Sequence, residues 1–259
     1  MKSIRSILLI ALLQAVSVTS VFAADELAQI KSAGVFKVGT EGTYAPFTYH
    51  DESGKLTGFD VDIASAIAQR LGVKPEFVEG KWDGLIAGLD VNRYDAVINE
   101  VSVTDARKAK YDFSTPYITT RAVLIVRTDN TTIKTFDDLK DKKSANTLTS
   151  NFGKIAKDHG ADVVGVQGFN ESIDLLTSGR VDATINDSLS FLDFKKHKPD
   201  AQVKIVATDS SSDADQSAVL LRKGDPALVA AIDKALADIK ADGTYAKISE
   251  KYFGKDVSQ

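Results

Sequence analysis

Arg107 is the side chain of this sequence best suited to hold an anion. It lies in a polar stretch that follows an apolar run, and the hydroxyl residue Ser102 precedes it by five positions. A guanidinium group presents a planar fork of N–H donors that matches a carboxylate, while nearby hydroxyl and backbone N–H groups can complete the hydrogen bonds to its oxygens. Because most arginines are exposed, a surface ion pair with Asp105 or Asp112 is the simpler interpretation of Arg107 taken alone.

Two acidic residues are candidates for binding a positively charged group. Asp187 follows a predicted strand and could receive an ammonium group, or it could cap the helix predicted to start near Ser188. Glu41 follows the first predicted strand and is either a pocket acid or a loop charge. A guanidinium from one part of the chain and a carboxylate from another would together fit a zwitterionic α-amino acid.

Aromatic residues near these groups could contact the body of a ligand. Trp82 opens a predicted helix directly after a strand, at the edge of an α/β sheet where ligands gather, so we place it in the site. Tyr44 and Phe47 flank Pro46 in the loop after the first predicted strand. We expect Phe47 to pack in the core, which is the usual place of an aromatic side chain.

Signatures of catalysis and of metal binding are absent from the sequence. It contains no G-x-S-x-G, no H-E-x-x-H, no phosphate-binding glycine loop and no cysteine. His50, His159 and His197 lie in polar segments without the spacing of metal ligands. We therefore expect no catalytic residue, no metal and no cofactor, and we predict that the protein is not an enzyme.

Strands alternating with helices must position the candidate residues. Apolar side chains at Ile63, Ile67 and Leu71 recur at helical spacing, and Gly72 ends that predicted helix. A second helix is predicted over residues 82–89. Strands are predicted at residues 35–40, around 77–78, and at 96–98 and 122–126. This alternation is typical of an α/β fold with largely parallel sheets.

An internal repeat indicates two lobes of similar construction. LDVNRYDAVINE (89–100) matches LTSGRVDATIND (176–187) in leucine, arginine, aspartate, alanine, isoleucine and asparagine. Alternatively, two helix–turn–strand units have converged, with Asp95 and Asp182 serving only the turn. If the repeat is genuine, its strands deliver Asn99–Glu100 and Asn186–Asp187 from opposite lobes into one cleft.

Two breaks in the chain suggest where the lobes divide. Thr115–Pro116–Tyr117 precedes a new strand, and the run at 210–213 precedes a strand predicted at 218–221. We expect lobe 1 to comprise residues 24–118 and 214–259, and lobe 2 to comprise residues 119–213. Two crossings of this kind form a hinge, around which lobes can close on a ligand.

The first 23 residues have the layout of a cleaved secretory signal. A basic start containing Lys2 and Arg5 precedes a short apolar run, and Val21–Phe22–Ala23 ends in a small residue. Loss of these two cations would take the formal charge from −4 to −6, which is unfavourable for binding nucleic acid. No second apolar segment is long enough to span a bilayer. We therefore expect a monomer in the periplasm, without membrane insertion.

Several phrases resemble the periplasmic solute-binding proteins for polar amino acids, and they cover nearly the whole mature chain. They are KVGTEGTYAPFTY, GKLTGFDVDIASAIAQRLG, KWDGLIAGLD, INEVSVTDARKAKYDFSTPY and DGTYAKISEKYFG. KWDG and KYDFSTPY most resemble the L-cystine-binding members. The resemblance implies a two-lobe fold in which each lobe is a mixed, mostly parallel sheet flanked by helices, with a two-strand hinge. It also implies capture of a polar α-amino acid, L-cystine above all, and delivery to an ABC-type permease in the inner membrane.

The resemblance assigns roles to individual residues. Arg107 would hold the ligand carboxylate, with Ser102 and the backbone of Glu100 nearby. Asp187 would hold the ammonium group. Tyr44 and Trp82 would enclose the ligand body, and Asn99 would lie beside Glu100 in the cleft.

The sequence departs from the family pattern at two places. Thr149–Ser150–Asn151 stands where the family usually has Gly-Thr, although Ser150 can still donate to an anion at a helix start. We count Thr149 and Ser150 with the site. Glu100 occupies a position that is commonly small or amide-bearing, and with Glu41 it suggests a second positive group on the ligand. Cystine has one, and so do lysine, arginine and ornithine.

An enzyme is the alternative from a different class. Some proteins of this fold resemble cyclohexadienyl dehydratases, which use an acid in the cleft to expel a leaving group. Glu41 or Glu100 could be such an acid if burial raised its pKa. The combination of Arg107 with Asp187 favours a binder of zwitterions.

Overall fold

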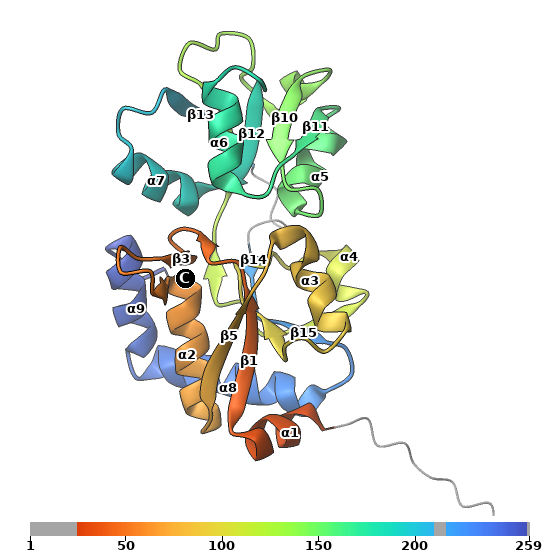
Figure 1. The fold of residues 1–259 in the computed structure, drawn as a ribbon, viewed down its shortest axis with the longest axis vertical. Coiled ribbons are helices and arrows are strands. Elements are labelled where there is room, and N and C mark those ends of the chain that lie inside the picture. Colours follow the sequence, from red (N-terminus) through yellow and green to blue (C-terminus); the bar gives the residue numbers. More distant parts are fainter. Residues whose placement is uncertain (1–24, 210–215, 258–259) are drawn as a thin grey trace, which may run out of the picture.

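The structure is a computed structural model in which residues 25–209 and 216–257 are described. Figure 1 shows two lobes, with lobe 1 drawn below and lobe 2 above. The predicted signal peptide at 1–23, the break at 210–213 and the boundary at 214 lie outside the described residues. Within the described ranges, no helix is both long and apolar enough to cross a membrane.

The sheet of lobe 1 has the strand order β5-β1-β6-β15-β7. Its strands are β5 (Lys74–Glu79), β1 (Val35–Thr40), β6 (Ala96–Val97), β15 (Leu220–Arg222) and β7 (Tyr111–Phe113). β1 is parallel to β5 and β6, whereas β15 is antiparallel to β6 and β7. A hairpin-like sheet of β2 (Thr43–Tyr44), β3 (Thr48–His50) and β4 (Leu56–Thr57) follows β1 in the chain.

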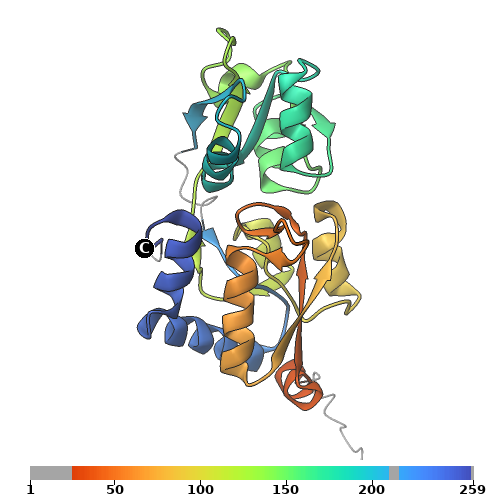
Figure 2. The same cartoon turned by 60° about the vertical axis from the view of Figure 1, so that its left-hand side comes forward.

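Helices cover both faces of this sheet, because its strands are apolar on both sides. Ala96 and Ile98 pack with α2 (Phe59–Leu71) and α8 (Pro226–Ala241), whereas Val97 packs with α3 (Trp82–Asp90). Gly72 ends α2 in the left-handed conformation, as the sequence predicts, and its N–H bonds Ala68 O and Gln69 O. The other helices of this lobe are α1 (Glu26–Ala33), α4 (Asp105–Lys108) and α9 (Thr244–Phe253). Figure 2 shows α2, α8 and α9 grouped beside the sheet.

Lobe 2 repeats the same strand pattern. Its sheet has the order β11-β10-β12-β9-β13, with β10 parallel to β11 and β12, and β9 antiparallel to β12 and β13. The strands are β11 (Asp162–Gly165), β10 (Lys143–Asn146), β12 (Ala183–Asp187), β9 (Ala122–Arg127) and β13 (Val203–Thr208). The helices are α5 (Asn151–Asp158), α6 (Phe169–Thr177), α7 (Ser188–His197) and the short 3₁₀ helix η1 (Phe136–Leu139).

The two copies of the sequence repeat form equivalent structures. Asp95 Oδ2 accepts from the N–H of Lys37 at 2.8 Å, and Asp182 Oδ2 accepts from the N–H of Lys143 at 2.9 Å. Each aspartate therefore ties its turn to the first strand of its own lobe. The turns also match, because Asn92 and Gly179 both adopt positive φ. The prediction of two similarly built lobes is confirmed.

The chain crosses between the lobes beside a small antiparallel sheet. β8 (Ile118–Thr119) pairs with β14 (Gln216–Ser217), and Ser217 also forms a β-bridge with Ser102. The prediction of one strand at 218–221 is wrong in extent. The chain forms β14 and β15 instead, and Ala218, whose N–H donates to Val101 O, lies between them. The lobe boundaries themselves stay a prediction.

Candidate ligand-binding site

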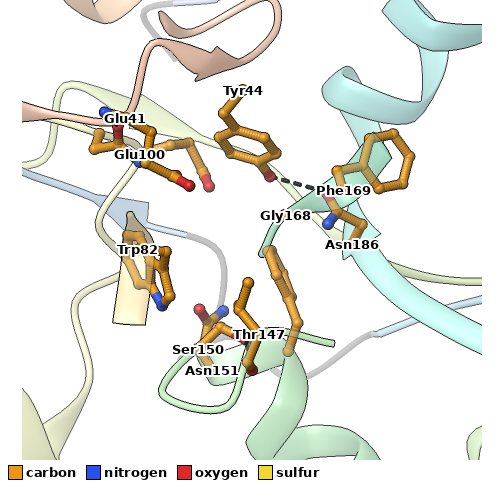
Figure 3. A pocket seen from close by; sticks show the side chains of 12 residues that line it. Glu41, Tyr44, Trp82, Glu100, Thr147, Ser150, Asn151, Gly168, Phe169 and Asn186 are labelled. Carbon is orange, nitrogen blue, oxygen red and sulfur yellow. Dashed lines mark hydrogen bonds between the residues drawn. The ribbon is translucent and has the colours of Figure 1, made fainter. Parts of the chain in front are cut away.

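A cavity of about 40 Å³ lies between the two lobes, and Figure 3 shows the side chains around it. Lobe 1 contributes residues at the ends of β1 and β6, in β2 and at the start of α3: Glu41, Tyr44, Trp82, Asn99 and Glu100. Lobe 2 contributes Thr147, Ser150, Asn151, Phe152, Gly168, Phe169 and Asn186. The strand ends of both lobes therefore meet at one place, as expected for α/β sheets.

Glu41 and Asn99 form a reciprocal pair on the lobe 1 side of this cavity. The N–H of Glu41 donates to Asn99 Oδ1 at 2.8 Å, and Asn99 Nδ2 donates to Glu41 Oε2 at 2.7 Å. Burial raises the pKa of Glu41 to about 7, although the bond from Asn99 opposes the shift. A cationic group beside Glu41 would restore the ionised carboxylate.

Asp187 combines the two roles that the sequence left open. Its Oδ1 caps α7 by accepting from the N–H groups of Leu189 at 2.8 Å and Ser190 at 3.1 Å. Its Oδ2 is buried and has no hydrogen-bond partner among the described residues. Burial raises the pKa of Asp187 to about 6. The side chain is fully buried and its neighbour Asn186 lines the cavity, so a ligand must displace some packing to reach Oδ2.

Arg107 lies next to the cavity, against Trp82. Its Cζ is 5.4 Å from the centroid of the Trp82 ring, and its Nη1 donates to Ser102 O at 2.8 Å. The acids of the simpler interpretation bond elsewhere: Asp105 lies 3.7 Å from Lys108 Nζ, and Asp112 accepts from the N–H of Gly224. Burial lowers the pKa of Arg107 to about 10, which leaves it cationic at neutral pH.

Two buried N–H donors on the cavity wall have no partner in the described part of the chain. They are Trp82 Nε1 and Asn151 Nδ2, from opposite lobes. In Figure 3 the indole nitrogen of Trp82 points toward the group formed by Ser150 and Asn151. Ser150 caps α5 by accepting from the N–H of Gly153 at 3.0 Å. Because buried polar groups are almost always satisfied, these donors indicate a polar ligand with acceptor atoms.

Three sets of hydrogen bonds join the lobes around the cavity. Tyr44 Oη donates to Asn186 Oδ1 at 2.9 Å (Figure 3), and Ser190 Oγ donates to Ala45 O at 2.8 Å. Asp83 Oδ1 accepts from Thr149 N at 3.0 Å and Thr149 Oγ1 at 2.9 Å. These bonds exist only while the lobes are close together. They therefore stabilise the closed arrangement.

Asp83→Ala is expected to weaken ligand affinity roughly 5- to 150-fold, because it removes two interlobe hydrogen bonds worth about 0.5–1.5 kcal/mol each. Asp83 does not line the cavity, so the loss arises from faster opening of the lobes and should raise the dissociation rate. Stopped-flow fluorescence measures that rate. Asp105→Ala, which removes an exposed acid of the same lobe, is the matched control. An unchanged dissociation rate in Asp83→Ala would show that this contact does not hold the lobes together.

The ligand-free protein is expected to lose stability as pH rises from about 5 to 8. Burial raises the pKa of Glu41 and of Asp60 to about 7 and that of Asp187 to about 6. These folded-state pKa values lie above the unfolded ones, so the native state binds more protons than the unfolded state at low pH. The stability contributed by those protons is lost as pH rises through about 6–7. Melting temperature measured against pH tests this, with Glu41→Gln expected to flatten the curve. A melting temperature that increases from pH 5 to 8 would contradict it.

Some of the predicted site residues line the cavity, and others lie beside it or away from it. The cavity wall contains Glu41, Tyr44, Trp82, Asn99, Glu100 and Ser150. Arg107 stacks on Trp82 of that wall and donates to Ser102 O, and Asp187 directly follows the wall residue Asn186 in the chain. Thr149 faces Asp83 and does not line the cavity, whereas Phe47 is fully buried in the lobe 1 core, where the sequence analysis placed it.

Asn186 lines the cavity, as the repeat predicted from its equivalence to Asn99. Phe169 also lines the cavity but was not predicted. Phe169 opens α6 after a glycine, much as Trp82 opens α3 after a strand. The remaining wall residues from lobe 2, such as Thr147 and Asn151, carry no comparable pattern.

The histidines lie outside this site. Each pairs with an acid, in the pairs His50–Glu79, His159–Asp137 and His197–Asp193. Among residues 25–209 and 216–257, no group of three or more potential ligand side chains could hold a metal ion.

Comparison with known proteins identifies relatives over nearly the whole chain. The pattern of the bacterial extracellular solute-binding proteins, family 3, matches residues 36–255. Among curated relatives, the L-cystine-binding protein TcyA of Bacillus subtilis (strain 168) is 46% identical over 236 residues, which cover 91% of this chain and 87% of TcyA.

Two solved structures bear on the arrangement of the lobes. An ancestral arginine-binding protein bound to arginine is 43% identical, with a TM-score of 0.79 over 85% of this chain and 99% of that protein. The L-cystine solute receptor of Neisseria gonorrhoeae, in the unliganded open conformation, is 44% identical, with a TM-score of 0.60 over 90% of this chain and 99% of the receptor. Because the identities are nearly equal, the higher score indicates that these lobes are closer to the ligand-bound arrangement.

Proposed function

Because this chain belongs to family 3 of the bacterial extracellular solute-binding proteins, we propose that it captures L-cystine between its lobes and delivers it to an ABC-type permease. The names of its relatives support the choice of ligand, since TcyA and the gonococcal receptor are both described as binding L-cystine. Capture by closure of the lobes is consistent with a cavity walled by both of them.

The observation that carries this proposal is the set of unsatisfied polar groups around the cavity. Trp82 Nε1 and Asn151 Nδ2 are donors without acceptors, and Asp187 Oδ2 is an acceptor without a donor in the described part of the chain. An amino acid supplies both kinds of partner, because its carboxylate accepts and its ammonium group donates. In our proposal Arg107 and Ser150 bind the carboxylate, while Asp187 binds the ammonium group.

A second positive charge on the ligand would suit the acids of lobe 1. Glu41 and Glu100 both line the cavity, and both have raised pKa values because of burial. L-cystine carries two ammonium groups, so its distal half could neutralise one of these acids. Arginine, lysine and ornithine share this property and form the second candidate class, which the likeness to an arginine-bound protein favours.

We propose binding without catalysis. The described relatives are solute-binding proteins, and Asn99 occupies Glu41 Oε2 with a hydrogen bond. Recovery of the ligand chemically unchanged after prolonged incubation would agree with this proposal.

We also propose export to the periplasm, which agrees with membership of an extracellular family. We propose that residues 1–23 are removed and that the mature protein begins at or near Ala24. N-terminal sequencing of periplasmic material is expected to find that residue first. Material that still begins at Met1 would contradict the proposal.

Thermal-shift screening against the common amino acids, L-cystine, ornithine, sugars and phosphate esters tests the proposed ligand. A compound that binds only the folded state raises the melting temperature by mass action. At a concentration of 100 Kd, it adds about 2.7 kcal/mol to the free energy of unfolding. L-Cystine is expected to give the largest shift, with basic amino acids second. A shift with sugars or phosphate esters but with no amino acid would overturn the proposed function.

A further inference from the structure

Glu100 touches both the cavity and the two crossings between the lobes. Its Oε1 accepts from Thr120 Oγ1 at 3.2 Å and from Ser217 Oγ at 2.9 Å. Thr120 follows β8 on the first crossing, and Ser217 lies in β14 on the second. The same carboxyl lines the cavity and is visible at its wall in Figure 3. A single oxygen thus joins the hinge strands at a point that a ligand can reach.

The backbone of Glu100 is held in an uncommon conformation. Its φ is +51°, in the left-handed region that non-glycine residues rarely adopt. The N–H of Glu100 donates to Asp60 Oδ2 at 2.5 Å, and Asp60 is fully buried at the start of α2. This bond anchors the backbone of Glu100. The bonds from Thr120 and Ser217 to Oε1 hold its carboxyl at the hinge.

Other acids face Glu100 from several elements. Asp187 approaches from β12 and Asp60 from α2, and both repel its negative charge. The phenols of Tyr44 and Tyr117 are neutral neighbours, and Arg107 is the attracting cation nearby. Burial, followed by repulsion from Asp187, raises the pKa of Glu100 well above its ordinary value. In the empty cavity, a proton on Glu100 relieves this repulsion.

We propose that Glu100 couples ligand charge to the hinge: an ammonium group of the ligand ionises its carboxyl, and the resulting carboxylate holds both interlobe crossings more tightly. This inference rests on the proposed function for the identity of the ligand. Hydrogen bonds to a charged acceptor are roughly twice as strong as those between neutral groups. Ligand binding therefore strengthens the bonds from Thr120 and Ser217, and the proton leaves to solvent.

Glu100→Gln is the most informative variant. An amide oxygen can still accept from both hydroxyl groups, but it carries no charge and cannot release a proton. Calorimetry with L-cystine at pH 7, in phosphate and in Tris buffer, counts the protons released because the two buffers differ in ionisation enthalpy. The native protein is expected to release a fraction of a proton per ligand. Glu100→Gln should release less and bind about tenfold more weakly.

Ser217→Ala is the matched control, because it removes one hinge bond and keeps the carboxyl. Proton release should persist in this variant while affinity falls. Two results would overturn the coupling. One is a binding enthalpy of the native protein that is the same in both buffers, and the other is a proton release in Glu100→Gln equal to that of the native protein.

The hinge can be followed without any ligand. The chain has no cysteine, so Lys31→Cys in lobe 1 and Lys157→Cys in lobe 2, both at exposed positions, can carry spin labels. The interlobe distance distribution is expected to depend on pH, and Glu100→Gln should reduce that dependence. A pH dependence unaffected by Glu100→Gln would contradict the inference. If L-cystine fails to bind but Glu100→Gln still reduces this dependence, the ligand proposal fails and the hinge role of Glu100 stands.

Discussion

Arg107→Ala is expected to weaken amino-acid binding by roughly 30-fold to several-thousand-fold, with little change in melting temperature. Removing one partner of a buried, hydrogen-bonded charge pair costs about 2–5 kcal/mol, and each 1.4 kcal/mol is about a factor of ten in dissociation constant. The fold depends little on this side chain, because within the described residues its guanidinium donates to Ser102 O and stacks on Trp82. Isothermal titration with L-cystine measures the loss.

Two further variants of this segment sharpen the test. Arg107→Lys keeps the charge but loses the planar fork, so it should recover only part of the affinity. Lys108→Ala removes the neighbouring cation, which is exposed and lies near Asp105, and should bind normally. Near-native affinity in Arg107→Ala would return Arg107 to the interpretation of a surface charge.

Trp82→Ala is expected to lose both affinity and stability. The ring is buried against Leu85, Leu89 and Tyr94, so truncation should cost about 3–5 kcal/mol of folding free energy. The same ring lines the cavity and contacts Arg107, and a ligand cation over its face could contribute roughly 0.5–2 kcal/mol. Trp82→Phe is the milder variant, since it keeps an aromatic ring but removes part of the indole together with the unsatisfied Nε1 donor.

Intrinsic fluorescence provides the readout for the native protein. Trp82 is the only tryptophan in the chain, so its emission should shift when a ligand enters and water leaves the ring. A large loss of stability with unchanged affinity, and no spectral change on adding ligand, would place Trp82 in the core alone.

The lobes themselves were predictable because local patterns and burial agree there. The run Val35–Thr40 is rich in β-branched residues, and it forms β1 with those bounds. The repeat predicted equivalent strand ends in both lobes. The structure agrees, because Asp95 and Asp182 each accept a hydrogen bond from the first strand of their own lobe. Short-range pattern was sufficient for these features.

Contacts between the lobes could not be predicted in the same way. Asp83 and Thr149 are 66 positions apart and meet only when the lobes close, so neither carries a local signal. Glu100 was recognised as an unusual acid, but its bonds to Thr120 and Ser217 depend on how two distant crossings pair. Asp187 shows a further limit, because one oxygen caps a helix while the other has no partner among residues 25–209 and 216–257. Residue type alone could not separate those roles.

A crystal structure of the mature protein with L-cystine tests the central claim most directly. One carboxylate of the ligand is predicted to lie within hydrogen-bond distance of the Arg107 guanidinium, about 2.7–2.9 Å for a charge-assisted bond. The adjacent ammonium group should reach Asp187 Oδ2, with the disulfide between Tyr44 and Trp82. A ligand seated away from Arg107 and Asp187, or a cavity that stays empty while L-cystine binds elsewhere, would contradict the account.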